Sequence, residues 1–561
     1  MIGHRIGVSS LGVEAANLLL DLPETGLYIE RRITIRHVDF DSLLKQSHFR
    51  RWSAVKERGG PFATVLNQTK RGIFMSLNLS TPTLLKQQAF IDGQWCDADS
   101  GQRFSVINPS NLEGIAEVPN MSAPETLTAI DAATGALAAW SGLTAKERAA
   151  RLRRWYELIL VHQEDLARIM TTEQGKPLAE ARGEVLYGAS FVEWFAEEAK
   201  RVYGDVIPAH GTDKRIVVIK QPIGVVAAIT PWNFPIAMIT RKVAPALAAG
   251  CTVVVKPSEY TPLSALALAE LSQQAGLPAG VLNIITTTQS AAVGETLCQD
   301  SRVRKLSFTG STPVGKLLMR QCADTVKKVS LELGGNAPFI VFDDADLDAA
   351  ITGLMASKFR NAGQTCVCTN RILVQDSVHD AFVEKLSAAV ARLKLGDGFA
   401  EGVTTGPLIN LKAVNKVQRL VDDAVGRGAE LQRPGVAGNL GKNFYTPAVL
   451  TGVTDSMEIA QKEIFGPVAT VFRFETEADA VAMANDTPYG LAAYFYARDI
   501  GRIWRVAEQL EYGMVGINEG IVSTEVAPFG GVKESGIGRE GSKYGIADFL
   551  EIKYLCMGSI S

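Results

Sequence analysis

Gly224-Val-Val-Ala-Ala-Ile229 is a short apolar run that leads directly into a stiff loop, Thr230-Pro-Trp-Asn-Phe-Pro235. Four more apolar runs follow, and a stretch with helical spacing separates each run from the next. Short apolar runs that alternate with helices are typical of parallel strands that are buried on both faces and joined by right-handed crossovers. The other predicted strands are Thr252–Val255, Val281–Ile285, Lys305–Phe308 and Lys328–Leu331, and the predicted helices are Ile236–Ala249, Pro262–Ala275, Ala291–Gln299 and Val314–Cys322.

Further structure is predicted on both sides of this sheet. Apolar residues recur at helical spacing from Thr126 to Gly204, which predicts a helical layer, and a second α/β region begins at Asp343 and runs to about 520. Two segments with strand character, Ile216–Gln221 and Asp548–Leu555, have no local cover. Exposed strand edges of this kind need a pairing partner.

The bulk composition is that of a globular chain. Of the 561 residues, 47% are hydrophobic and 21% are charged, and the formal net charge is −3. With this charge, the chain is not expected to bind nucleic acid or an anionic membrane surface electrostatically. The apolar stretch near the middle of the chain, Val243–Val255, has 13 residues and is too short to span a bilayer.

The cysteines favour a reducing compartment. There are 7 of them, scattered along the chain and odd in number, so we expect no disulfide framework. A cytoplasmic location is expected instead. Cys366-Val-Cys368 has no second Cys/His pair at ligand spacing, so we expect no metal site there.

Residues 1–74 differ from the rest of the chain. They carry 11 Lys/Arg and 7 Asp/Glu without a sustained helical or strand period, and a second methionine, Met75, follows them. Because the segment has both signs of charge and no secretory pattern, it does not resemble a targeting peptide. We expect a poorly ordered, dispensable N-terminal extension; the alternative is a functional appendage.

Cys366 and Glu332 form the most informative pair of reactive side chains. Cys366 lies in Gly363-Gln-Thr-Cys366, and Glu332 lies 34 residues upstream in Leu331-Glu-Leu-Gly-Gly-Asn336. A thiol needs a base to become a nucleophile, and none of the chain's 6 histidines lies in a Gly-rich or Cys-containing motif. Glu332 is therefore the candidate base.

Three loops at predicted strand ends could bind a nucleotide and an oxyanion. Ser311 follows Gly310 at the start of a predicted helix, whose N-terminus can hold a phosphate. Glu259, three residues after Lys256, can accept hydrogen bonds from a ribose diol and would repel a 2′-phosphate. Asn233 offers an amide N–H from a stiff loop, which suits an oxyanion hole.

Together these segments resemble those of the aldehyde dehydrogenase superfamily, most closely the succinate-semialdehyde dehydrogenases. The resemblance covers about 85–557, nearly everything but the extension. The motifs that carry it are Thr230-Pro-Trp-Asn-Phe-Pro235, Lys256-Pro-Ser-Glu259, Phe308-Thr-Gly-Ser311, Leu331-Glu-Leu-Gly-Gly335, Phe359-Arg-Asn-Ala-Gly-Gln-Thr-Cys366, Glu463-Ile-Phe-Gly-Pro467 and Gly538-Arg-Glu-Gly-Ser-Lys-Tyr-Gly545.

The resemblance implies a role for each matching residue. Cys366 would be the nucleophile, Glu332 the base, and Asn233 with the Cys366 backbone N–H the oxyanion hole. Two arginines, Arg241 and Arg360, with Ser523 would hold a carboxylate at the far end of the substrate. The implied NAD- or NADP-binding residues are Thr230, Trp232, Lys256, Ser258, Glu259, Ser311, Leu333, Glu463 and Phe465.

The implied reaction oxidises succinate semialdehyde to succinate through a thiohemiacetal and a thioester on Cys366. Glutarate semialdehyde or another ω-carboxylated aldehyde is an alternative substrate, since one methylene changes binding by only about 1–3 kcal/mol. A non-catalytic protein on the same scaffold is a third alternative, which intact Cys366, Glu332 and Asn233 disfavour. Glu259 predicts that NAD is preferred or at least well used.

Cys368 lies two residues after the nucleophile. Related enzymes use such a pair as a redox switch, so a reversible, strained Cys366–Cys368 disulfide is predicted. The alternative is that Cys368 is simply a small buried residue.

The expected fold is α/β: a Rossmann-like cofactor domain, an α/β catalytic domain and a small β arm for oligomerisation. The resemblance also implies a homodimer or homotetramer, no nucleic-acid or membrane partner, and a place in GABA degradation. The expected domains are 85–204 with 225–332 for the cofactor, 333–520 for catalysis, and 205–224 with 534–557 for assembly.

Overall fold

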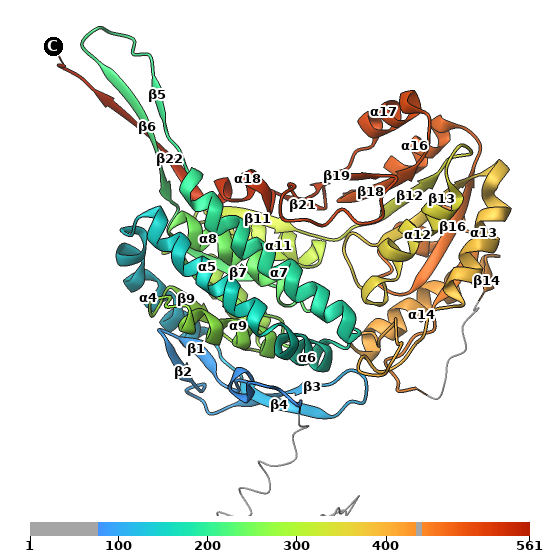
Figure 1. Cartoon of the computed structure of the whole chain (residues 1–561), viewed down its shortest axis with the longest axis horizontal. Coiled ribbons are helices and arrows are strands. Elements are labelled where there is room, and N and C mark those ends of the chain that lie inside the picture. The colour runs from blue at the N-terminus through green and yellow to red at the C-terminus, as the bar shows by residue number, and fades with distance from the viewer. Residues whose placement is uncertain (1–76, 433–439, 561) are drawn as a thin grey trace, which may run out of the picture. The chain divides into compact units, whose positions relative to one another are not determined.

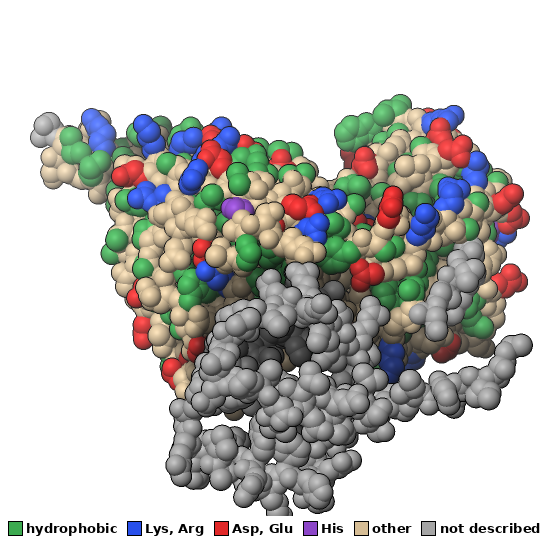
Figure 2. Space-filling model, turned by 60° about the horizontal axis from the view of Figure 1, so that its bottom comes forward, with side chains coloured by type: hydrophobic (Ala, Val, Ile, Leu, Met, Phe, Trp, Pro, Cys, Tyr) green, Lys and Arg blue, Asp and Glu red, His purple; other side chains and the backbone are tan. Residues whose placement is uncertain are grey.

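The computed structural model describes residues 77–432 and 440–560. The expectation that residues 1–74 are a poorly ordered, dispensable extension therefore falls outside the described residues. No described helix is both long enough and apolar enough to cross a membrane. On the face shown in Figure 2, basic and acidic side chains are interspersed over the described surface.

An eight-stranded sheet forms the first part of the described chain, in the order β2-β1-β9-β8-β7-β10-β11-β21. Its five central strands are parallel. These are the five predicted strands, which are confirmed with ends that agree within 2 residues. The strands are β7 (Val225–Ile229), β8 (Thr252–Lys256), β9 (Leu282–Ile284), β10 (Val303–Thr309) and β11 (Lys328–Glu332), with β1 (Ala89–Ile91), β2 (Gln94–Cys96) and β21 (Gly536–Ile537) at the edges.

Both faces of this sheet are covered, because alternate side chains of each central strand enter different hydrophobic cores. Val226 and Ala228 of β7 belong to one core, whereas Val225, Ala227 and Ile229 belong to the other. One face carries α8 (Ala237–Ala249) and α9 (Pro262–Gln274), backed by α5 (Ala145–Val161), α6 (Gln163–Gln174) and α7 (Leu178–Glu198); the other carries α4 (Ala123–Ser141), α10 (Ser290–Gln299) and α11 (Thr312–Ala323).

Local sequence explains where several of these helices begin. Thr144 and Glu147 form a reciprocal capping box at the start of α5, with Glu147 N donating to Thr144 Oγ1 at 3.3 Å. Pro313 lies in the first turn of α11, where its missing N–H has no cost, and Ser311 is the N-cap residue. The N-terminus of α11 is thereby fixed at the carboxyl end of β10.

A seven-stranded sheet forms the second α/β region, as predicted from Asp343 onward, although its first strand begins a few residues earlier. Figure 1 shows its helices packed around it. Its order is β14 (Glu430–Gln432), β15 (Ala448–Thr451), β16 (Val468–Phe474), β13 (Thr369–Gln375), β12 (Ala337–Val341), β18 (Ala492–Tyr496) and β19 (Met514–Ile517), and its helices are α12 (Leu347–Lys358), α13 (Asp376–Val390), α14 (Leu411–Gly426), α15 (Glu458–Gln461), α16 (Glu477–Asn485) and α17 (Ile500–Gln509).

A three-stranded antiparallel sheet projects beyond the first sheet (Figure 1). The two segments expected as uncovered strands form its long pair, β6 (Arg215–Pro222) and β22 (Leu550–Met557), and β5 (Asp205–Ile207) pairs with β6. Large apolar side chains are exposed along it: Val206 is 82% exposed and Ile552 72%. The smaller elements are β3 (Arg103–Ile107), β4 (Gly114–Pro119), β17 (Tyr489–Gly490), β20 (Val532–Lys533) and α18 (Ser542–Gly545).

Candidate active site

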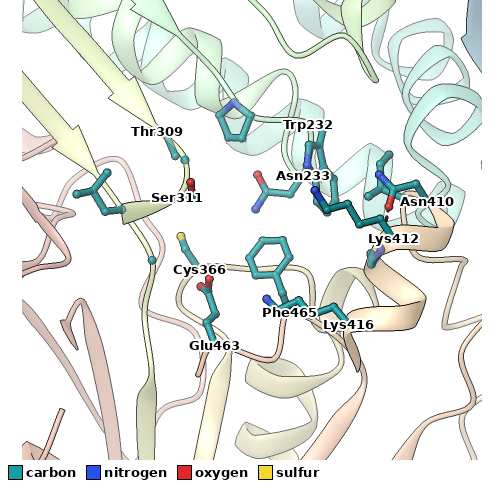
Figure 3. A pocket seen from close by; sticks show the side chains of 16 residues that line it. Trp232, Asn233, Thr309, Ser311, Cys366, Asn410, Lys412, Lys416, Glu463 and Phe465 are labelled. Carbon is teal, nitrogen blue, oxygen red and sulfur yellow. Dashed lines mark hydrogen bonds between the residues drawn. The ribbon is translucent and has the colours of Figure 1, made fainter. Parts of the chain in front are cut away.

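A cavity of about 500 Å³ lies where loops of the two sheets meet (Figure 3). In Figure 3 the Cys366 sulfur and the Asn233 amide point toward the same space, with Glu463 and Phe465 beside them. The residues that line the cavity are Pro231, Trp232, Asn233, Thr309, Gly310, Ser311, Leu333, Gly334, Cys366, Ile409, Asn410, Lys412, Ala413, Lys416, Glu463 and Phe465.

The Cys366 segment is held in an unusual backbone conformation. Three successive residues before it, Asn361, Ala362 and Gly363, have φ of 52°, 54° and 75°. Left-handed non-glycine residues cost about 1–3 kcal/mol each and persist only where packing enforces them. A Cβ at Gly363 would lie 2.3 Å from the carbonyl oxygen of Gly466, so this segment must pass close to the Glu463–Gly466 loop.

Cys366 is a resting thiol in this environment. Burial raises its pKa to about 12; the Arg241 charge opposes that rise, while the Glu463 and Glu332 carboxyls reinforce it. Because the thiolate is the nucleophile, a base or a positively charged cofactor ring must help to deprotonate this thiol.

Glu332 ends β11 in a buried position, and within the described part of the chain its Oε2 atom has no hydrogen-bond partner. Burial and the nearby Glu540 carboxylate raise the pKa of Glu332 well above its usual value. Burial acts on Glu540 as well, but Arg241 and Lys242 outweigh it and lower the pKa of that carboxyl. The pKa of Glu332 is thus raised while the pKa of Glu540 is lowered. Such a difference between two neighbouring carboxyls suits Glu332 to proton transfer.

Asn233 lies in the loop after β7, and its Nδ2 donates to the Gln364 carbonyl at 3.0 Å. An amide nitrogen carries two hydrogens, so one remains to donate to an oxyanion on the substrate. The rings of Trp232 and Phe465 meet edge to face, with centroids 5.6 Å apart, and hold this loop against the Glu463 loop.

Two parts of the cavity have groups that could hold the phosphate and ribose of a dinucleotide. Ser311 lines it at the N-terminus of α11, a suitable place for phosphate. A Cβ at Gly334 would lie 3.4 Å from Glu463 Oε2, an ordinary van der Waals contact, so Gly334 borders this carboxylate in the cavity. Glu463 also accepts a hydrogen bond from Gly335 N at 3.1 Å, and burial raises its pKa to about 7.

The other expected cofactor residues lie at the carboxyl ends of β7 and β8. Lys256 and Glu259 are 3.6 Å apart at Nζ and Oε2, and Ser258 between them is buried. The hydroxyl of Thr230 is buried without a hydrogen-bond partner among the described residues. Glu259 lines a second cavity of about 380 Å³ that shares two residues with the first, Ile409 and Asn410.

The two expected carboxylate-binding arginines are in different situations. Arg241 is 1% exposed and ion-paired with Glu540, its Nε donating to Oε2 at 2.6 Å. Arg360 lies over the Phe234 ring at 5.3 Å, and its Nε is buried without a hydrogen-bond partner within 77–432 and 440–560. The Nη2 atom of Arg241 also has no hydrogen-bond partner there. Its guanidinium is ion-paired with Glu540, however, whereas no ion pair of Arg360 is present among the described residues, so Arg360 is the better candidate for a substrate carboxylate.

Two residues near these arginines were not identified from the sequence. The Tyr187 hydroxyl is buried near both arginines and the expected Ser523, without a hydrogen-bond partner among the described residues. Glu540 is ion-paired with Arg241. Helical spacing made Tyr187 indistinguishable from core residues. Glu540 stood in the quoted Gly538–Gly545 motif, but its partner lies 299 positions away.

Cys368 is buried and is not among the residues that line the cavity. Its Sγ donates to the Lys358 carbonyl at 3.4 Å and to the Thr369 carbonyl at 3.3 Å. A disulfide with Cys366 would require the thiol to leave both carbonyls, and this disulfide stays a prediction.

The sequence matches known proteins over most of its length. The profile of the Aldehyde dehydrogenase family matches residues 95–555. Glutarate-semialdehyde dehydrogenase of Pseudomonas putida is 63% identical over 481 residues, 86% of this chain and 100% of that protein. The NADP(+) succinate-semialdehyde dehydrogenase GabD of Escherichia coli is 62% identical over 482 residues, with the same coverage. The crystal structure of succinate-semialdehyde dehydrogenase from Burkholderia pseudomallei superposes with a TM-score of 0.85 at 60% identity, covering 86% of this chain and 100% of that one.

Proposed function

The chain belongs to the aldehyde dehydrogenase family, and from this membership and the site geometry we propose that it oxidises succinate semialdehyde to succinate with NAD or NADP. The observation that carries the substrate proposal is Arg360, whose buried Nε has no hydrogen-bond partner in the described chain. A substrate carboxylate could pair with this guanidinium, with Tyr187 and Ser523 as neighbouring hydroxyl donors.

The first chemical step is addition of the Cys366 thiolate to the aldehyde carbonyl. The negative charge that develops on the carbonyl oxygen is stabilised by the free amide hydrogen of Asn233, a kind of contact worth about 3–4 kcal/mol in comparable sites. A bound oxidised nicotinamide supplies the hydride acceptor. The cofactor would be held by Ser311 at the pyrophosphate, Glu463 at a ribose and Phe465 beside the ring.

The second step releases the acyl group from Cys366. In its deprotonated form Glu332 takes a proton from water, and the resulting hydroxide attacks the thioester carbonyl. The Cys366 thiolate is the leaving group, and it takes the proton of the carboxylic acid that forms, so the products are succinate and the Cys366 thiol. The proton taken from water stays on Glu332 until it passes to solvent. Glu540 stays ionised through Arg241 and Lys242, so its negative charge keeps Glu332 a stronger base.

Glutarate semialdehyde is the second candidate substrate. The P. putida relative named for it is as similar to this chain as the E. coli relative named for succinate semialdehyde, at 63% and 62% identity. The two substrates differ by one methylene, so the same arginine would bind either carboxylate. Kinetics with both aldehydes would rank them, since a fitted pocket discriminates one methylene by about 10- to 200-fold.

Removal of Arg360 tests the carboxylate proposal. Arg360→Ala is expected to raise KM for succinate semialdehyde roughly 10- to 100-fold, because a charge-assisted hydrogen bond is lost. The KM for the uncharged butanal should change little.

Arg241→Ala should also raise KM for the semialdehyde. It should lower kcat too, since it removes one of the two cations that pair with Glu540. Arg419→Ala, at an exposed ion pair with Glu458, is the matched control. Equal losses for both aldehydes in Arg360→Ala would show that Arg360 is structural.

Glu259 is proposed to set the cofactor preference toward NAD. Its carboxylate would lie near the 2′-phosphate of NADP with like charge, although Lys256 at 3.6 Å offsets part of that charge. Calorimetric titration should give a lower Kd for NAD than for NADP, and Glu259→Ser should tighten NADP binding about 10-fold. Glu295→Ser, on the exposed face of α10, is the control. A strong NADP preference that Glu259→Ser leaves unchanged would reject this assignment; the E. coli relative is named for NADP(+).

We also propose a separate function for each part of the chain. Residues 85–204 and 225–332 would bind the cofactor, 333–520 would carry catalysis, and the arm, 205–224 with 534–557, would assemble a cytoplasmic homodimer or homotetramer. The exposed apolar side chains of the arm, such as Ile552 and Val206, support assembly, because uncovered strands of this kind seek a partner. A place in GABA degradation would follow from the substrate.

A further inference from the structure

A buried cluster of polar side chains lies behind the Asn233 loop, outside the residues that line the Cys366 cavity. Its centre is an ion pair between Lys176, in the connection from α6 to α7, and Glu184 on α7, with side chains 0% and 1% exposed. Burying two charges is unfavourable unless each is fully satisfied, so an ion pair this deep is poor support for stability alone. Its hydrogen bonds point to another role.

Both members of the pair bind the backbone around Asn233. Lys176 Nζ donates to the backbone carbonyl of Asn233 at 2.7 Å. Glu184 Oε1 accepts hydrogen bonds from the N–H groups of Ile236 at 2.9 Å and Ala237 at 3.3 Å, where α8 begins. A carboxylate is well placed at a helix N-terminus. The loop that carries Asn233 is thus held at its middle and at its end.

The same carbonyl is also tied to the segment that carries the nucleophile. Asn361 Nδ2 donates to the Asn233 carbonyl at 2.9 Å, and Asn361 is one of the left-handed residues before Cys366. The Asn361 Oδ1 atom accepts from Gln174 Nε2 at 2.9 Å, and Gln174 Oε1 accepts from Lys176 N at 2.9 Å. Lys176 therefore closes a ring of hydrogen bonds that fixes the Asn233 peptide relative to the Cys366 segment.

The side chain of Asn233 has little else to orient it. Its Nδ2 donates one hydrogen to Gln364, while its buried Oδ1 has no partner among the residues that the structure describes. A tilt of the Asn233 peptide would therefore move the free amide hydrogen away from the oxyanion. An oxyanion donor acts only over a narrow distance, and a displacement of about 1 Å can cost on the order of 100-fold in rate.

We propose that Lys176, held by Glu184, is a positioning residue for aldehyde oxidation: by fixing the Asn233 carbonyl, it aims the Asn233 amide at the oxyanion that forms on the Cys366 adduct. This inference rests on the proposed function only in requiring Cys366-dependent aldehyde chemistry. It does not depend on which aldehyde is the natural substrate.

A double-mutant cycle of Lys176→Met with Asn233→Ala tests this proposal, with butanal as substrate so that carboxylate binding plays no part. Lys176→Met is expected to lower kcat about 10- to 100-fold, with KM for butanal and Kd for NAD nearly unchanged. Asn233→Ala should lower kcat about 10²- to 10³-fold. In the Asn233→Ala background, Lys176→Met should add less than about a twofold loss, because it acts through that amide.

Two further measurements separate positioning from a structural role. The rate of Cys366 alkylation by iodoacetamide should be the same in Lys176→Met and the wild type, since the nucleophile itself is not displaced. Lys176→Arg, which keeps a cation, should recover part of the lost kcat. The control is Lys86→Met, which breaks the ion pair between Lys86 and Glu270 and should leave kcat unchanged.

The proposal is overturned if the losses from Lys176→Met and Asn233→Ala multiply in the double variant, or if alkylation slows as much as kcat. Lys176→Met leaves Glu184 buried without its cation and could prevent folding. In that case Lys176→Met/Glu184→Met, which removes both charges, takes its place in the cycle with the same expected non-additivity. A failure of the carboxylate proposal would instead appear in the Arg360→Ala kinetics, so the two outcomes are distinguishable.

Discussion

Cys366→Ala is expected to abolish aldehyde oxidation, lowering kcat by at least about 10⁴-fold, as loss of the nucleophile does in other enzymes with covalent intermediates. No other thiol can replace it. Of the six other cysteines, only Cys368 is nearby, and its Sγ is turned toward two backbone carbonyls. Succinate formation from the semialdehyde, followed by chromatography, gives the rate directly.

Binding of the cofactor should survive this change. The alanine removes only the sulfur from the cavity wall, and the groups proposed to hold the cofactor, such as Ser311 and Glu463, stay in place. Quenching of tryptophan fluorescence by NAD, with Trp232 in the cavity, should give a Kd near that of the wild type. Cys96→Ala, at a partly exposed thiol on β2, is the matched control with full activity. Undiminished turnover by Cys366→Ala would eliminate the covalent mechanism.

Glu332→Gln is expected to separate acylation from hydrolysis. The glutamine has nearly the same shape but cannot accept the proton of the attacking water, so release of the acyl group should slow by about 10²- to 10⁴-fold. Succinyl groups should then accumulate on Cys366. Intact-protein mass spectrometry after mixing with cofactor and succinate semialdehyde would detect the acylated enzyme, which should be scarce in the wild type.

The pH dependence adds a second signature of Glu332. Its pKa is raised by burial and by Glu540, and only the deprotonated carboxylate can act as a base. Acyl release in the wild type should therefore increase as pH rises through this elevated pKa, and the increase should disappear in Glu332→Gln. The surface variant Glu477→Gln, at an ion pair with Arg505, should behave like the wild type. Normal steady-state turnover of Glu332→Gln would place the base elsewhere.

The first sheet was predictable from sequence because its signal is local. Each central strand is a short run buried on both faces, so every residue of β7, from Val225 to Ile229, is apolar. Helix starts such as Ser311-Thr-Pro313 are encoded just as locally. The antiparallel edge strands β1, β2 and β21 escaped prediction, since they have only 2 or 3 residues each and too little sequence to show a period.

The candidate reactive side chains were likewise proposed from their own segments. The motifs that contain Cys366, Glu332 and Asn233 indicate a reaction through the types of their residues. Because no histidine lies in the motif of the thiol, a carboxylate was the predicted base. Their partners could not be identified in this way. Arg241 looked equivalent to Arg360 until the fold brought Glu540, 299 positions away, against it.

The sequence by itself therefore determined the sheet and its crossovers and proposed the candidate reactive groups, because periodicity, capping and turn chemistry act over a few neighbouring residues. Only the tertiary structure decided which charges are neutralised and which remain available. Lys176 pairs with Glu184 and reaches Asn233 across 57 positions. Within 77–432 and 440–560, Glu332 forms no ion pair and Arg360 Nε has no hydrogen-bond partner. Burial makes these pairings matter, since a charge removed from water depends on the few groups that packing places beside it.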